Sequence, residues 1–140
     1  MVQLPSAHVD YRVSLGYVGT VLRLIGVVPL LPLAVALYYG DDPLPFFATS
    51  AVMVGGGVLL ERIRGDGDLG NREAFLLVSL AWLVVPLAGT VPYLVAGMGT
   101  VATPVNAMFE SMSGFTTTGA TVLGEIDVAR HGHAMLLWRQ

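Results

Sequence analysis

The chain has 140 residues, of which 54% are hydrophobic and 12% are charged, and its mean hydropathy is +0.71. A soluble domain carries roughly twice that charged fraction, so the composition indicates an integral membrane protein. The formal net charge is −3, every basic residue is an arginine, and the absence of cysteine excludes disulfides, thiol catalysis and thiolate metal sites. No nucleophile–base pair, phosphate-binding glycine loop or basic patch is evident. We therefore expect no enzyme, no bound cofactor and no nucleic-acid partner.

Long apolar segments predict three transmembrane helices, at residues 13–39, 44–60 and 74–96. The first segment contains Arg23, and an arginine at the bilayer centre costs several kcal/mol. We therefore expect Arg23 at the water interface, with Leu24–Tyr39 as the apolar span. Pro29 and Pro32 are expected to kink this helix, which a membrane helix tolerates when its neighbours satisfy the freed backbone groups.

Three consecutive glycines, Gly55–Gly57, interrupt the side-chain pattern of the second segment. They allow two interpretations. The glycines can act as a hinge, or they can form a smooth face that lets another helix approach closely. We favour the close approach, because small residues are typical of helix contacts in membranes.

Arginines predict the orientation of the chain. The loop between the second and third segments holds three arginines, whereas the loop between the first and second holds two aspartates and no basic residue. By the positive-inside rule the arginine-containing loop is cytoplasmic, and so is the N-terminus. We therefore expect a multi-pass protein of the cell membrane, surrounded by lipid, whose third segment ends on the external side.

A half-length helix is predicted after the third segment. Gly97 and Gly99 break the helical pattern, Thr103 suits an N-cap, and Pro104 suits the first helical position. The new helix, residues 104–113, is ~15 Å long, which is about half a bilayer. It cannot span the membrane, so it must enter from outside and return.

The returning segment "GFTTTGATVL" is rich in hydroxyl groups and non-helical in character. Non-helical backbone at membrane depth is tolerated only where it is buried in protein or lines water. Successive carbonyls turned toward one axis can replace the hydration shell of a cation. Turning them requires unusual backbone angles, which Gly119 adopts without steric cost. The carbonyl end of the preceding helix dipole also favours a cation. These features predict an ion-selectivity filter.

The string "FESMSGFTTTGATVL" resembles the first filter loop of the Trk/Ktr/HKT superfamily of potassium transporters, with the Trk membrane subunit most similar. The order of segments is similar too: two leading helices, a further helix, a pore helix, a filter, and "LLWRQ" opening the next span. The resemblance covers nearly the whole chain. It implies potassium uptake, with K⁺ as the transported ion.

The resemblance also implies roles for individual residues. In this family four repeats of one chain surround a pore, each with a single-glycine filter segment. Three consecutive carbonyls and the filter glycine would then bind K⁺: Thr116, Thr117, Thr118 and Gly119. Pore-helix residues would support the loop from behind: Glu110, Ser113 and Gly114. The family further implies a homodimer of membrane subunits and a cytosolic nucleotide-binding regulatory subunit.

We therefore expect an all-α integral membrane fold with two regions: residues 1–70, a two-helix transmembrane region with its cytoplasmic loop, and 71–140, the first pore repeat of a potassium-channel-like fold. The repeat comprises a transmembrane helix (74–96), a re-entrant pore helix (104–113), a filter (115–120) and the start of the next helix (133–140). Since one repeat supplies one quarter of a filter, we expect a fragment truncated at the second repeat helix. The alternatives are a homo-oligomeric cation channel subunit and a non-conducting membrane scaffold or relic fragment.

Four ionisable side chains near the predicted filter allow more than one interpretation. Glu110 can bind an ion, but we favour a structural role in which its carboxyl group is neutral or hydrogen-bonded to nearby backbone. His131 and His133 have metal-ligand character without an evident third ligand, so we expect solvated loop residues. Arg139 either extends to the interface or points at the pore as a barrier to ions, and the sequence leaves both open.

Overall fold

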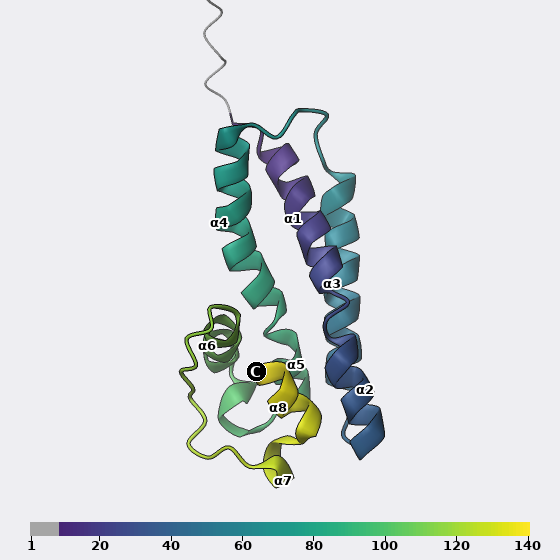
Figure 1. Cartoon of the computed structure of the whole chain (residues 1–140), viewed down its shortest axis with the longest axis vertical. Helices are drawn as coiled ribbons and strands as arrows, with labels where there is room; N and C mark the ends of the chain where they lie inside the picture. Colours follow the sequence, from purple (N-terminus) through teal and green to yellow (C-terminus); the bar gives the residue numbers. More distant parts are fainter. Residues whose placement is uncertain (1–8) are drawn as a thin grey trace, which may run out of the picture.

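The protein is represented by a computed structural model that describes residues 9–140 (Figure 1). The predicted region 1–70 and the predicted cytoplasmic N-terminus thus begin with residues outside this range. The described residues form helices and loops, with no strand among them. In chain order the helices are α1 (Tyr11–Ile25), α2 (Leu30–Tyr39), α3 (Leu44–Arg62), α4 (Asn71–Ala88), α5 (Val91–Ala96), the 3₁₀ helix η1 (Gly99–Ala102), α6 (Pro104–Phe115), α7 (Val128–His131) and α8 (His133–Arg139).

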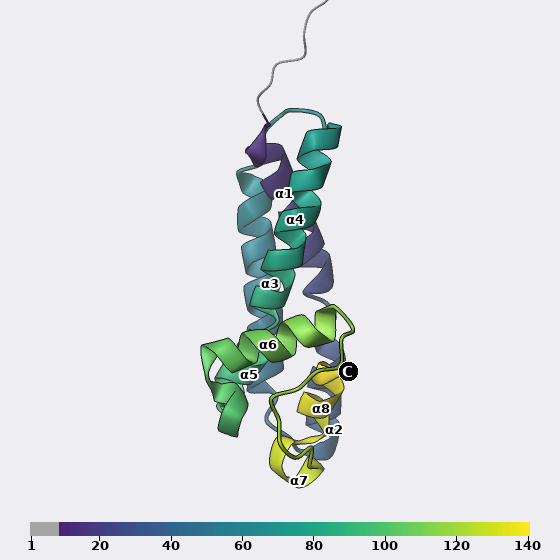
Figure 2. The ribbon, with the colours of Figure 1, turned by 90° about the vertical axis from the view of Figure 1, so that its left-hand side faces the viewer.

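Long helices and short helices occupy different parts of the molecule. Helices α1, α3 and α4 lie side by side along the long axis, and α2 and α5 continue the first and third of them (Figure 1). The short helices α7 and α8 gather near α2 and α5 at the opposite end from the start of α1. Helix α6 runs across the long axis rather than along it (Figure 2). The short elements therefore surround the lower half of a three-span bundle.

Three helical stretches are long and apolar enough to cross a membrane: Tyr11–Tyr39, Leu44–Arg62 and Asn71–Ala96. Their lengths are 29, 19 and 26 residues, against the roughly 20 that a bilayer requires. In each stretch only 28% of the most apolar 18-residue window is buried inside the chain. The remaining apolar surface is far too extensive for water and suits lipid or other membrane helices. The predicted all-α membrane fold is confirmed.

The first span is interrupted where its sequence requires it. A turn at residues 26–29 separates α1 from α2 and ends at Pro29, whereas Pro32 lies within α2 without breaking it. The Ser50 hydroxyl of α3 donates a hydrogen bond of 2.7 Å to the carbonyl of Gly26. A neighbouring helix therefore satisfies a backbone group at the break, as membrane-embedded backbone requires.

The third span is interrupted at Gly89 and Thr90, between α4 and α5. The Thr90 N–H bonds to the carbonyl of Leu87 (3.2 Å) rather than to that of Pro86, and its hydroxyl bonds to the same Leu87 oxygen (2.6 Å). Pro92 follows in the first turn of α5, where it needs no hydrogen-bond partner. The chain thus changes direction within the third span, and the carbonyl of Pro86 is left for another partner.

Glycines allow α1 and α3 to pack closely. A Cβ atom at Gly57 would lie 2.6 Å from the carbonyl oxygen of Gly19 and 2.7 Å from the backbone nitrogen of Arg23. A Cβ atom at Gly55 would meet nothing within 4 Å, and α3 continues unbroken through all three glycines. The glycine run therefore provides a close helix contact through Gly57, not a hinge. Arg23 also pairs with Glu61 near the end of α3 (3.2 Å).

The turn between α2 and α3 holds the start of α8. The Asp41 carboxylate accepts a hydrogen bond from the backbone N–H of Ala134 (3.0 Å), and the ring of His133 stacks on that of Tyr39 at 4.0 Å. His133 opens α8 at the position predicted for the start of the next helix, and its side chain stays exposed, as expected for a solvated residue. Asp41 satisfies a free N–H at the helix start, which is the role of an N-cap supplied by a distant residue.

Replacing Gly57 by valine should destabilise the bundle, because the new side chain would overlap backbone atoms of α1 that cannot move independently. Overpacking of this kind typically reduces the free energy of unfolding by about 1–3 kcal/mol. The control is Gly55→Val, which changes helix propensity equally but meets open space. Thermal unfolding of the purified protein in detergent would compare the two variants. Equal stability of the two would contradict the proposed contact.

Candidate functional site

Helix α6 begins where its sequence predicts and ends two residues later than predicted. The Thr103 hydroxyl accepts a hydrogen bond from the N–H of Asn106, and Pro104 occupies the first helical position. The helix has 12 residues, two more than predicted, and therefore measures ~18 Å. A bilayer core is ~30 Å thick, so α6 cannot cross it.

Contacts with α4 show how deep α6 reaches. The Ser111 hydroxyl donates to the carbonyl of Pro86 at 2.5 Å, which provides the partner that the α4–α5 break leaves open. At the end of α6, the ring of Phe115 meets the ring of Trp82 edge to face, with centroids 5.2 Å apart. Trp82 lies near the middle of the 26-residue span. The end of α6 therefore lies beside the middle of the third span.

The loop after α6 has the backbone of a tight, non-helical return. Thr117 has a φ of 56° and Gly119 a φ of 73°, both in the left-handed region. The N–H groups of Thr117 and Thr118 bond back to the carbonyls of Gly114 (3.0 Å) and Ser113 (2.9 Å). A threonine at positive φ is sterically strained, by about 1–2 kcal/mol. The surrounding structure therefore imposes this conformation on the loop.

Hydroxyl groups tie the loop to the end of α6. Ser113 is buried and donates to the carbonyl of Ala120 at 2.6 Å. Thr116 lies 2.8 Å from the carbonyl of Met112, and its oxygen is 2.7 Å from that of Thr118. Thr117 to Ala120 are exposed. The loop thus has one face bound to its own helix and one open face.

Glu110 is the centre of a buried polar cluster behind the loop. Its side chain is 1% exposed. One carboxylate oxygen accepts from the Thr121 hydroxyl (2.5 Å) and the Val122 N–H (2.6 Å), and the other accepts from Arg139 Nε (3.1 Å). The contacts favour the supporting role over the ion-ligand role, because both oxygens already have protein partners.

The structure brings all seven predicted site residues together within one helix and the loop that follows it. Their role as ion ligands or supports stays a prediction. Three residues bond to Glu110: Thr121, Val122 and Arg139. The sequence indicated Arg139 without its partner, and it did not indicate the other two. Arg139 had a visible signal, because an arginine in an apolar segment requires a partner. Thr121 and Val122 carried no such signal in the sequence, since apolar and hydroxyl residues are ordinary in a loop of this composition.

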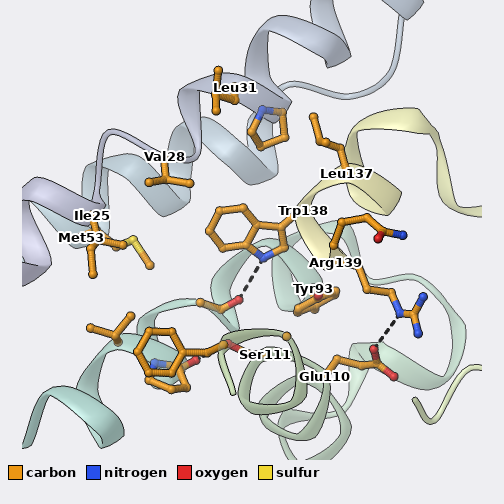
Figure 3. Close-up of a pocket in the computed structure, with 17 residues that line it drawn as sticks. Ile25, Val28, Leu31, Met53, Tyr93, Glu110, Ser111, Leu137, Trp138 and Arg139 are labelled. Atoms are coloured by element: carbon orange, nitrogen blue, oxygen red, sulfur yellow. Dashed lines mark hydrogen bonds and ion pairs between the residues drawn. The ribbon is translucent and has the colours of Figure 1, made fainter. Parts of the chain in front are cut away.

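A cavity of about 320 Å³ lies behind α6, between the α1–α2 break, the α4–α5 break and α8 (Figure 3). Its walls are mostly apolar, and the ring of Trp138 projects into the middle of it. The indole N–H of Trp138 donates to the carbonyl of Gly89 (3.3 Å). Glu110 and Arg139 form the polar end of this cavity. Helix α8 therefore contacts both the α4–α5 break and the support of the loop.

The two histidines of the predicted loop have separate environments. His131 Nδ1 lies 2.9 Å from the carbonyl of Asp127, and His133 Nδ1 lies 3.9 Å from Asp41. Across residues 9–140, no group of three or more histidine, cysteine or acidic side chains is placed to hold a metal ion.

These observations define a multi-pass membrane protein in which a shorter helix packs beside the middle of the third span and a polar loop follows it. No protein-family model matches the chain. It is 37% identical over 134 residues to the Trk system potassium uptake protein TrkH of Vibrio parahaemolyticus, covering 94% of this chain and 27% of that protein. It is 33% identical to TrkH of Halomonas elongata, covering 92% of this chain and 27% of that protein. An uncharacterized cation transporter of Methanocaldococcus jannaschii is 30% identical, with 93% and 27% covered.

The fold agrees with the sequence similarity. The crystal structure of the potassium transporter TrkH from Vibrio parahaemolyticus matches with a TM-score of 0.80 and 34% identity, covering 94% of this chain and 28% of that chain. Over nearly its whole length the chain is therefore similar to Trk system potassium uptake proteins. It spans about a quarter of the length of the relatives that it matches.

Replacing Ser113 by alanine should loosen the loop, because the carbonyl of Ala120 loses its buried hydroxyl partner. The loss of one hydrogen bond, ~1 kcal/mol, corresponds to roughly fivefold faster local opening. Hydrogen–deuterium exchange of a peptide covering residues 116–122 would measure it. Ser79→Ala is the control, since its hydroxyl bonds only within its own exposed helix face. Unchanged exchange in Ser113→Ala would show that this bond does not hold the loop.

Proposed function

We propose that this chain contributes to potassium uptake across the cell membrane, with Thr116–Gly119 forming one wall of a selectivity filter. One observation carries the proposal: α6 ends at the level of Trp82, at mid-span, and an exposed loop with two positive φ angles follows it. Exposed non-helical backbone at that depth must face water or protein rather than lipid. The similar TrkH proteins are named potassium uptake proteins, which supports potassium as the transported ion.

The proposed mechanism is dehydration compensated by backbone oxygen. The carbonyls of Thr116, Thr117 and Thr118 replace part of the hydration shell of K⁺, and Gly119 supplies the backbone angle that continues their direction. The C-terminal end of α6 adds partial negative charge near the inner end of the filter. Glu110 and Ser113 hold the loop in place from behind. One loop supplies about one quarter of such a filter, so three equivalent loops must complete it.

The proposal includes the surroundings of the chain. The exposed apolar faces of the three spans contact lipid and the other pore repeats. The arginine-containing loop between α3 and α4 lies on the cytoplasmic side, together with the N-terminus. A homodimer and a cytosolic nucleotide-binding regulatory subunit, as the family resemblance implies, complete the proposed assembly.

Replacing Gly119 by aspartate should abolish potassium uptake. The substitution places a side chain at a φ of 73° and a carboxylate at the filter. The assay is rubidium or potassium uptake by cells that lack their own uptake systems and express the natural gene product containing this chain. Gly124→Asp is the control, because Gly124 has open space and no positive φ. Normal uptake by a Gly119→Asp protein present in the membrane would refute the filter assignment.

The mass of the native polypeptide would show whether the other three filter segments belong to the same chain. An antibody against an α3–α4 loop peptide should detect, in native membranes, a chain several times larger than 14.8 kDa, because a single polypeptide then carries all the repeats. A chain of 14.8 kDa that cross-links into tetramers would instead indicate the homo-oligomeric alternative. A 14.8 kDa chain without such assembly would indicate a non-conducting scaffold.

A further inference from the structure

A buried ion pair joins α6 to α8 behind the loop. Arg139 Nε lies 3.1 Å from Glu110, and the two side chains are 15% and 1% exposed (Figure 3). The residues are separated by 28 others in the chain, which include the whole loop and α7. Close contact between opposite charges in an apolar setting is energetically costly to break, because the remaining charge would stay buried.

The hydrogen-bond pattern shows which charge state Glu110 takes. Its partners all donate: Val122 through its N–H, Arg139 through Nε, and Thr121 through its hydroxyl. The Thr121 hydroxyl donates to Glu110, and its oxygen also accepts from the N–H of Leu123 (3.0 Å). A protonated carboxyl group would need an acceptor for its own O–H. Three donors and no acceptor match an ionised carboxylate.

An ionised Glu110 binds the outer part of the loop more strongly than a neutral side chain could. Hydrogen bonds to a charged acceptor are roughly twice as strong as those between neutral groups. Two of these bonds hold Thr121 and Val122, the residues that follow the proposed filter. Among the described residues, the Arg139 side chain bonds to Glu110 and not to the loop itself. Its effect on the loop must therefore pass through that carboxylate.

We infer that Arg139 is a positioning residue of the filter, which keeps Glu110 ionised and thereby holds Thr121 and Val122 in register. This inference rests on the proposed function. In this inference Arg139 is a counter-ion for Glu110 behind the loop, and it is not a barrier to ions in the pore. It also makes the position of α8 a determinant of filter geometry.

A double-mutant cycle tests the pair in the natural gene product. Arg139→Gln and Glu110→Gln each leave one buried charge without its partner, whereas the double variant leaves none. The readout is potassium uptake at increasing sodium concentration, normalised to the amount of protein in the membrane. We expect each single variant to lose potassium-over-sodium discrimination by at least about fivefold, and the double variant to lose less than either single variant. Arg139→Lys, which keeps the charge, should retain part of the discrimination.

The exposed pair of Arg130 and Glu125 provides the matched control. Their side chains are 71% and 77% exposed and 3.6 Å apart, so Arg130→Gln should leave discrimination unchanged. Wild-type potassium-over-sodium discrimination in Arg139→Gln would overturn the inference. A double variant that discriminates no better than either single variant, or that fails to reach the membrane, would overturn it too. The Gly119→Asp variant separates the two proposals. If it abolishes uptake while Arg139→Gln changes nothing, only the positioning role fails; if it transports normally, the filter itself is wrong.

Discussion

Backbone groups inside a bilayer find no water, so each interruption of a helix must be satisfied from within the protein. This constraint connects the elements of the chain. At the first interruption Ser50 of α3 bonds to Gly26. At the second, Ser111 of α6 bonds to the carbonyl of Pro86 and Trp138 of α8 to that of Gly89. The same contacts that satisfy the interrupted spans therefore fix α6 and α8 against them, so the helix breaks are the points at which the short helices are attached.

The loop after α6 obeys the same constraint on one face only. Its inner face is satisfied by protein, since Ser113 binds the carbonyl of Ala120 and Glu110 binds the N–H of Val122. Its outer face, from Thr117 to Ala120, stays exposed. Carbonyls there need a donor, a water molecule or a cation. A one-sided arrangement differs from a loop that only fills space, because such a loop would have its polar groups paired on both faces.

Local features of this fold were readable from the sequence, and distant pairings were not. Apolar length identified the three spans, and Thr103 with Pro104 identified the start of α6, because caps depend on adjacent residues. The close contact at Gly57 needed the partner Gly19, 38 positions away, so the glycine run alone left two interpretations. The partner of Arg139 was equally hidden. A charged residue in an apolar segment indicates that it has a partner. The hydrophobic pattern of the sequence does not identify which acidic residue is that partner.

Helix α8 shows why the two leading helices matter to the loop. Residues from other elements bind this helix at both ends. Asp41, from the turn between α2 and α3, binds the N–H of Ala134 at its start, and Glu110 binds Arg139 at its end. A displacement of the α2–α3 turn would therefore move α8 and, through the ion pair, the residues that follow Gly119. The leading helices thus belong to the same mechanical unit as the loop, and their role extends beyond anchoring the chain in the membrane.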